Sequence, residues 1–119
     1  MKYMLLIYGD ENALDVETRE KCYGDSTELA HELHGQGKFL AANPLHPTSK
    51  ATSVRMREGR RAITDGPFAE THEQLGGYFL VDAANLDEAI DIAGRIPGAK
   101  WGTVEIRPIL ELPNLPEES

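Results

Sequence analysis

The chain has 119 residues, which suits a single domain that buries about two-thirds of its unfolded surface. Its formal net charge is −8, from 12 basic and 20 acidic residues. Such a surface repels phosphate backbones and anionic lipids, so we expect neither a nucleic-acid nor a membrane partner. The single cysteine, Cys22, leaves no internal disulfide to form.

Residues 2–8 predict a buried strand, because they are almost continuously apolar or aromatic. The run is too short for a secretory signal, and Gly9-Asp10-Glu11 stands where a cleavage site of small residues belongs. No other apolar run approaches the length needed to cross a bilayer. We therefore expect a cytoplasmic protein that begins with a strand.

A helix is predicted to begin after Asp15, which suits the N-cap position, and to end at Gly35 or Gly37. Gly24 lies inside this helix and weakens it by about 1 kcal/mol relative to alanine, so the helix could either continue or break near it. Residues 38–43 then return to an extended pattern. The helix face predicted to turn towards a sheet consists of Tyr23, Ser26, Leu29, Ala30 and Leu33.

The middle of the chain predicts a hairpin. Residues 51–57 alternate between two faces, Glu58-Gly59 fits a tight turn, and residues 61–64 form the return strand. Two roles are open for its arginines, which either bind an anionic substrate group or pair with acidic residues of a partner subunit. These arginines are Arg55, Arg57, Arg60 and Arg61.

A strand is predicted over residues 77–82 and a second helix after Asn85, with Glu88 completing a capping box. Pro97-Gly98 is expected to end the helix, and residues 101–107 alternate as the last strand. The buried stripe of the helix is predicted to be Leu86, Ala89, Ile90 and Ala93.

This order of elements predicts a ferredoxin-like α+β domain over residues 1–108, with both helices on one face of an antiparallel sheet. Residues 109–119 form an acidic, proline-containing tail that is expected to dock loosely or trail in solvent. The uncovered sheet face needs shelter from water, so we expect a homodimer formed sheet on sheet. That face is predicted to carry Tyr3, Tyr78 or Phe79, Leu80 and Trp101 in some combination.

The segment from Asp65 to Phe68 is the most distinctive of the chain. Gly66 and Pro67 constrain its backbone and specify a shaped loop, and Phe68 is expected to be buried. Two roles are open for Asp65. Its carboxylate either faces a pocket floored by Phe68 and acts as a general acid or base, or accepts amide hydrogens from the turn that follows.

Four histidines are candidate partners of Asp65 or candidate metal ligands. His31 and His34 are three residues apart, whereas a zinc-protease helix needs a spacing of four, so we predict a solvated helix face and no metal site. His46, beside the hairpin, and His72, in the loop after Asp65, are the candidates to assist that carboxylate.

Residues 64–71, Thr-Asp-Gly-Pro-Phe-Ala-Glu-Thr, followed by residues 73–78, Glu-Gln-Leu-Gly-Gly-Tyr, resemble the signature of the YCII-related family in its DGPF-motif branch. Residues 1–8, 51–55 and 104–108 agree with it. The resemblance implies a dimeric α+β barrel in a bacterial cytoplasm. Some relatives are proposed to be acid/base enzymes, one line is linked to dehydrochlorination of hydroxylated aromatics, and others resemble accessory proteins of alternative sigma factors. Shorter members carry a histidine in the first helix, at a position that falls near Ser26 here.

Two hypotheses follow. In the first, a small organic molecule binds between the sheet and the 65–73 loop, and Asp65 abstracts a proton with elimination. His72 or His46 assists, Arg55 holds an anionic group, and Gly66, Pro67 and Phe68 shape the site; no metal or organic cofactor is implied. In the alternative, the protein is a non-catalytic binding or regulatory module, for example one that acts with an alternative sigma factor.

Overall fold

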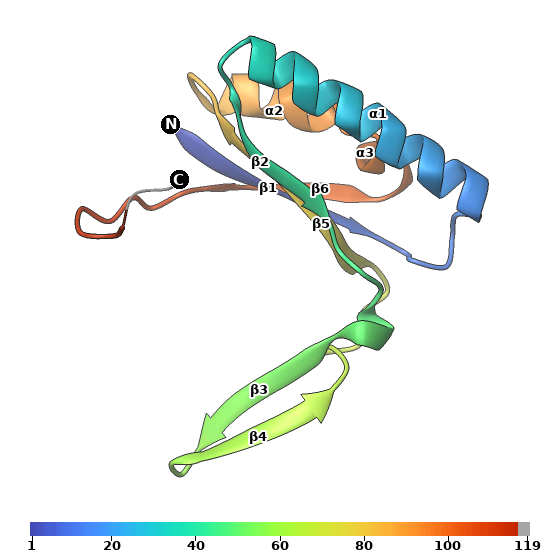
Figure 1. Ribbon diagram of the computed structural model, residues 1–119, viewed down its shortest axis with the longest axis vertical. Coiled ribbons are helices and arrows are strands. Elements are labelled where there is room, and N and C mark those ends of the chain that lie inside the picture. The colour runs from blue at the N-terminus through green and yellow to red at the C-terminus, as the bar shows by residue number, and fades with distance from the viewer. Residues whose placement is uncertain (117–119) are drawn as a thin grey trace.

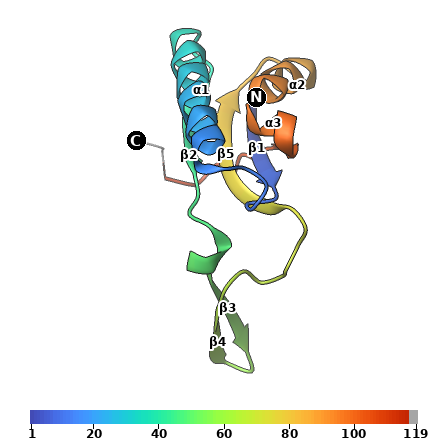
Figure 2. The ribbon, with the colours of Figure 1, turned by 90° about the vertical axis from the view of Figure 1, so that its right-hand side faces the viewer.

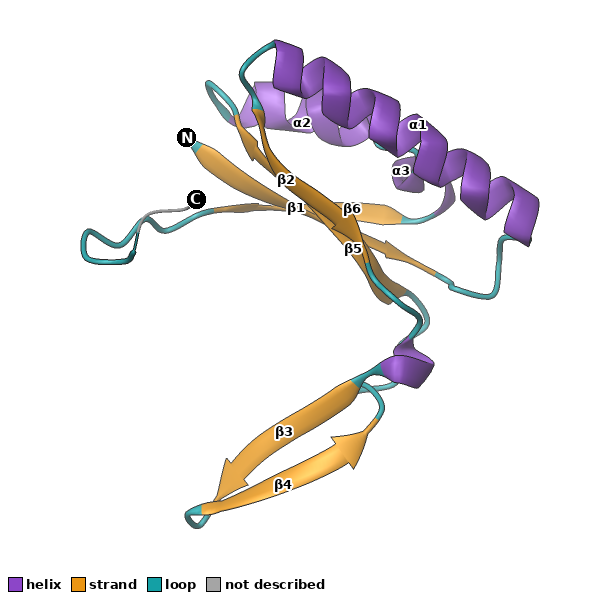
Figure 3. Ribbon diagram, viewed as in Figure 1, coloured by secondary structure: helices purple, strands orange, loops and turns teal. Residues whose placement is uncertain are grey.

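A computed structural model describes residues 1–116 as an α+β structure (Figures 1 and 3). The strands are β1 (Lys2–Gly9), β2 (Phe39–Pro44), β3 (Thr52–Arg57), β4 (Arg60–Asp65), β5 (Gln74–Asp82) and β6 (Thr103–Pro108). The helices are α1 (Val16–Gly35), α2 (Leu86–Arg95) and the single turn α3 (Gly98–Trp101), with a 3-10 turn, η1 (Thr48–Lys50). Every predicted strand and both predicted helices are present.

Four strands form one antiparallel sheet in the order β2-β5-β1-β6. The central strand β1 pairs with β5 on one side and β6 on the other, and β2 pairs with the outer edge of β5. The units β1-α1-β2 and β5-α2-β6 are therefore interleaved β-α-β units with both helices on one face (Figure 2). The predicted ferredoxin-like fold is confirmed.

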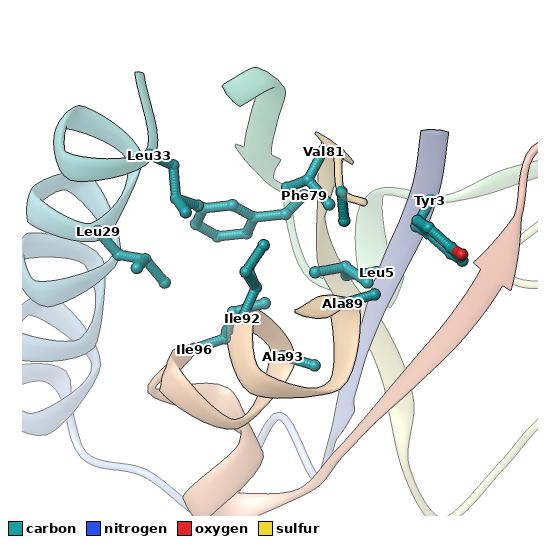
Figure 4. Packing of buried hydrophobic residues seen from close by; sticks show 11 residues of the cluster. Tyr3, Leu5, Leu29, Leu33, Phe79, Val81, Ala89, Ile92, Ala93 and Ile96 are labelled. Atoms are coloured by element: carbon teal, nitrogen blue, oxygen red, sulfur yellow. The ribbon is translucent and has the colours of Figure 1, made fainter. Parts of the chain in front are cut away.

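The core lies between this sheet and the two helices (Figure 4). Leu33 from α1 lies beside Phe79 of β5, and Leu5 of β1 faces α2. The largest side chains with essentially no exposure are Leu5, Leu33, Ile96 and Val81. Burial of each stabilises the fold by about 1.5–3 kcal/mol. Leu33 thus fixes the C-terminal half of α1 to the sheet.

The two sheet faces follow from burial and register. Tyr3 and Phe79 belong to the core under the helices, so Tyr78 and Leu80 lie on the opposite, open face. The prediction is confirmed for Tyr78 and Leu80 and wrong for Tyr3. Residues 2–8 are apolar on both faces, and such a run contains no alternation from which a face could be assigned.

The buried stripe of α2 is also corrected. Leu86 and Ile90 are about half exposed, whereas Ile92 is buried with Ala89 and Ala93. Both sets repeat at helical spacing, and only contact with the sheet decides between them. The helix ends at Arg95, but the chain then forms α3, so Trp101 lies in a helical turn and not in the last strand.

Helix α1 runs unbroken through Gly24, so the glycine does not interrupt it. Its N-terminus is held by Asp15, whose carboxylate accepts the Thr18 amide hydrogen at 2.8 Å as predicted. Its C-terminus ends near Gly37, where a φ of 74° suits glycine. Because Leu29 and Leu33 anchor only the C-terminal half, the N-terminal half extends beyond the core.

Strands β3 and β4 form a separate two-stranded sheet, which we call the arm (residues 52–65). It projects from the body, the four-stranded sheet with its helices, on the side opposite α1 and α2 (Figures 1 and 2). Glu58 and Gly59, with φ of 53° and 75°, make the predicted tight turn. The radius of gyration is 16.1 Å, above the value of about 13.5 Å for a compact chain of this length.

Residues 109–116 continue from β6 along the body. The Ile109 amide donates to the Lys2 carbonyl at 2.9 Å, and Leu110, Leu112 and Leu115 are exposed beyond it. The last part of the predicted tail, residues 117–119, lies outside the described residues. In residues 1–116, no helix is both long enough and apolar enough to cross a membrane.

Candidate functional site

A large groove lies between the overhanging half of α1 and the sheet. Its volume is about 1140 Å³, and apolar atoms dominate its lining. This volume is slightly above the range of about 300–1,000 Å³ that is typical of small-molecule sites. The predicted stripe of α1 explains it: Leu29 and Leu33 pack on the sheet, whereas Tyr23 and Ser26 lie beyond the core and line the groove.

Two glycines allow close packing of the segments that line the groove. Gly77 is buried on β5, and a Cβ there would meet the Asn43 carbonyl oxygen at 3.0 Å. Gly98 faces Ile7 so closely that a Cβ would meet its Cγ2 at 2.5 Å. Both glycines line the groove, so their small size permits the close packing of β2, β5 and α3 around it.

Hydrogen bonds fix one end of the groove. The Glu11 amide donates to Gln74 Oε1 at 3.0 Å, and the Glu11 carboxylate accepts from both the Thr48 amide and the Thr48 hydroxyl. The Arg19 guanidinium donates from Nη2 to the carbonyls of Glu11 and Leu14, each at 3.2 Å. The loop after β1 is thereby tied to α1, to β5 and to the approach to the arm.

In the described part of the chain, Arg19 is the one arginine in the groove lining, which contains no lysine. An arginine has five N–H hydrogens, and the two bonds to carbonyls use only Nη2. Within residues 1–116, no hydrogen bond uses its Nε or Nη1. The nearby Asp15 carboxylate is engaged by Thr18, whose amide hydrogen bond holds the pKa of Asp15 below its ordinary value. Arg19 is thus a positioned cation with donors to spare.

Three of the four histidines line the groove: His31 and His34 from α1 and His46 from the loop after β2. The His34 ring packs edge-on against Phe39, with centroids 6.4 Å apart and planes at 66°. Among the described residues, no group of three or more His, Cys, Asp or Glu side chains is placed to hold a metal ion. The three imidazoles are hydrogen-bonding and aromatic groups on the groove wall.

The predicted site around Asp65 lies elsewhere. Asp65 ends β4 opposite Thr52 at the base of the arm and is exposed. Gly66, with a φ of 103°, donates its amide to the Ala51 carbonyl at 2.7 Å, and its own carbonyl accepts from the Ser53 hydroxyl at 2.8 Å. Across residues 1–116, no hydrogen bond reaches the Asp65 carboxylate, so the expected turn bonds to it are not formed.

The neighbouring motif residues are open to solvent as well. Phe68 is 81% exposed, so the prediction of a buried Phe68 is wrong for a single chain. Pro67, His72 and Arg55 are also exposed, and none of them lines the groove. Of the residues predicted from sequence to form the site, only His46 lies in the groove. The structure of one chain does not bring it together with Asp65.

Comparison with known proteins places the chain among its relatives. A family model described as the YCII-related domain matches residues 1–113. An uncharacterized protein of Rhizobium meliloti (strain 1021) is 38% identical over 114 residues, which cover 92% of each chain. The chain belongs to the YCII-related family. The matched residues include every element that forms the groove and the arm.

Sequence reasoning missed the groove of this YCII-related protein, although one signal was present. Arg19 precedes Tyr23 by four residues and Ser26 by seven, so it continues the stripe predicted to face the sheet. Arginine, tyrosine and serine on a face expected to be buried indicate a wall that no sheet covers. The stripe has an apolar half for packing and a polar half for the groove.

Proposed function

We propose that this YCII-related protein binds a small organic molecule, with an apolar body and an anionic group, in the groove under α1. The observation that carries the proposal is a mostly apolar groove of about 1140 Å³ with one hydrogen-bonded arginine on its wall. Sites for small organic ligands combine these two features, since apolar walls supply affinity and few polar groups fix orientation.

The choice of an anionic group rests on the charged hydrogen-bond donors that remain unused in the groove lining. The acid Glu11 lines the groove, but Thr48 occupies its carboxylate, and the Asp10 carboxylate accepts the Asn12 amide hydrogen at 2.9 Å. Arg19 retains unused N–H donors that suit a carboxylate or sulfonate. A charge-assisted hydrogen bond of this kind contributes about 1.5–3 kcal/mol.

The proposal is for binding and leaves Asp65 out of the ligand site. General acid or base chemistry at Asp65 needs a substrate held against its carboxylate. In one chain that carboxylate and Phe68 are both exposed at the base of the arm. A reaction there requires walls from another chain, and the groove needs none.

We also propose that the protein is a homodimer that buries the open face of its four-stranded sheet. Met4 and Leu6 of β1 and Tyr78 and Leu80 of β5 form the centre of that face. An apolar strip without helices on it is typical of a surface that binds another protein.

A reducing compartment such as the cytoplasm suits the unpaired Cys22 on the groove wall.

The ligand proposal is tested with 2-naphthoate and its neutral analogue 2-naphthol, by calorimetry and by amide chemical-shift mapping. We expect wild type to bind both, with naphthoate the tighter, and the shifts to concentrate in α1, β2 and β5. Ser26→Trp fills the groove from its wall and should abolish both signals. Glu28→Trp, an exposed α1 position outside the groove lining, is the matched control and should bind as wild type does.

Arg19→Gln separates the charge from the apolar walls. It should weaken naphthoate by about tenfold or more and leave naphthol within about threefold, since only the carboxylate uses the guanidinium. Equal binding of naphthoate by wild type and Ser26→Trp, or failure of wild type to bind either probe at millimolar concentration, would remove the groove as the ligand site.

A further inference from the structure

The arm has no third strand and no second layer. β3 and β4 pair only with each other, through six consecutive residue pairs from Thr52 opposite Asp65 to Arg57 opposite Arg60. A two-stranded hairpin alone in water is marginally stable at best. A regular arm of this length therefore needs something to lie against.

The two faces of the arm differ in chemistry. Opposite residues of an antiparallel pair share a face, so Val54 and Ile63 lie together, with Met56 one pair further along. Their side chains are 59%, 60% and 57% exposed. The other face carries Arg55, Arg57 and Arg60. Arg61 lies opposite Met56 on the first face, so that face is apolar around Val54, Ile63 and Met56 with one arginine beside them, whereas the other face is cationic.

The arm extends on the side of the body that carries the open sheet face, away from α1 and α2 (Figures 1 and 2). In one chain the arm and that face remain apart, because β3 and β4 belong to a separate sheet. The connections at the base are held in place: Leu45 donates its amide to the Gly76 carbonyl at 2.8 Å, and Thr48 binds Glu11. The direction of the arm is thus set by the body.

Charge favours a second copy of this chain as the occupant. Residues 52–65 contain four arginines and two acidic residues, Glu58 and Asp65, so their formal charge is +2. Because the whole chain has a charge of −8, the remaining residues carry −10. The cationic arm of one copy is attracted to the anionic body of another copy, and each copy supplies both an arm and a body. A nucleic acid would meet the same arginines but also the repulsion of the whole molecule.

We propose that the arm is exchanged between two copies of the chain. The apolar face formed by Val54, Met56 and Ile63 packs against the partner, and the partner's arm packs in return. A two-fold axis closes such an exchange, since each copy offers one arm and accepts one arm. The inference rests on the proposed homodimer and is independent of the ligand in the groove. It also gives the exposed Phe68, at the arm base, a surface to contact.

The test is the dimer dissociation constant of the full chain, measured by sedimentation velocity over a range of concentrations. The double variant Val54→Asp with Ile63→Asp places charge on the apolar face and should raise the dissociation constant by about 100-fold or more. Ala62→Asp, on the opposite face of the same strand, is the matched control and should stay within about threefold. At concentrations where wild type and variant are both monomeric, thermal unfolding of the body should remain unchanged, because the arm lies outside the core.

A second measurement uses a photo-crosslinking residue at position 56 in dimers mixed from ¹⁴N- and ¹⁵N-labelled chains. Exchange predicts crosslinks that join the two isotopes. A dimeric wild type whose dissociation constant is unchanged in the double variant, with crosslinks inside one chain only, would overturn the arm exchange and leave the sheet-face dimer intact. A monomeric wild type would remove both. Binding of a 20-base-pair DNA duplex that depends on Arg55 and Arg57 would assign the arm to nucleic acid instead.

Discussion

The body and the arm both carry apolar side chains on paired strands, but only the body buries them. In the body, side chains such as Leu5 and Leu33 have no exposed surface and pack between a sheet and two helices. In the arm, Val54 and Ile63 are equally apolar and face each other across the strands, yet each remains more than half exposed. Strand pairing alone specifies the arm, whereas burial specifies the body.

The difference shows which part of the chain is complete by itself. The body buries a core of apolar residues between its sheet and its two helices within one chain. The arm leaves Val54, Met56 and Ile63 exposed in one chain. A region that is regular in hydrogen bonding but unpacked marks an interaction surface more clearly than composition does.

Truncation of a buried leucine should have the largest effect. Leu33→Ala leaves a cavity between α1 and the sheet and should lower the free energy of unfolding by about 2–5 kcal/mol. Ile63→Ala removes a side chain of similar size from the arm and should change it by less than about 0.5 kcal/mol. Urea denaturation at concentrations where the chain is monomeric measures both. Equal losses would mean that the arm packs on its own body.

Two glycines of the body should respond in opposite directions. A Cβ at Gly102 would lie 2.0 Å from the Tyr8 carbonyl oxygen and 2.9 Å from the Gly9 Cα, and backbone atoms cannot rotate away. Gly102→Ala should therefore destabilise by about 1–3 kcal/mol. Gly94 in α2 has open space around it, so Gly94→Ala should stabilise by about 0.4–1 kcal/mol. Thermal and urea unfolding of the two variants check the signs.

The N-caps of α2 and of the overhanging helix α1 should differ in their dependence on pH. Asn85 accepts the Glu88 amide hydrogen at 2.9 Å, and Asn85→Ala should cost about 1 kcal/mol at every pH. Asp15 has a pKa below its ordinary value of 3.8, chiefly because the Thr18 amide donates to its carboxylate. A carboxyl group whose pKa is lower in the folded state stabilises the fold at pH values above its unfolded pKa. That contribution is lost as the pH falls through the folded pKa.

Asp15→Ala should therefore destabilise at neutral pH, and the difference from wild type should shrink as pH falls below 3.8. Urea midpoints across this range, with Asn85→Ala as the pH-independent reference, measure it. A difference that persisted unchanged in acid would mean that the Asp15 carboxylate does not act in its charged form.

The sequence was sufficient for the elements and their order, because alternation, capping residues and turn residues are local signals. Asp15, Asn85 and the Glu58-Gly59 turn all act as predicted. It was insufficient where two apolar stripes compete, as in α2, since packing on the sheet decides between Ile90 and Ile92. The same limit applied to the strand of residues 2–8, whose two faces are both apolar.

The site was harder to predict than the fold for a related reason. A distinctive motif attracts a functional interpretation, but Asp65 and Phe68 are exposed at the base of the arm. The groove arises instead because α1 is longer than the core that it covers, which no local pattern encodes. Only Arg19, a charge in line with an apolar stripe, indicated that part of the helix faces something other than the sheet.

The turn of the arm should give the smallest effect on the body and so tests the comparison most sharply. Gly59 has a φ of 75°, and Glu58 adopts 53° without being glycine. Gly59→Ala should weaken the hairpin by about 1–2 kcal/mol, and Glu58→Gly should relieve strain at the neighbouring position. Hydrogen exchange of the arm amides should become faster in the first variant and slower in the second.

At concentrations where the chain is monomeric, both turn variants should leave the unfolding of the body unchanged, because β3 and β4 share no strand pairing with the four-stranded sheet. They should nevertheless move the dimer dissociation constant in opposite directions, since a frayed arm must be ordered before it can pack on a partner. A dissociation constant that ignored both variants would show that the arm contributes nothing to assembly. A body whose stability followed the turn would show that arm and body fold as one unit, and the contrast between them would then describe exposure alone.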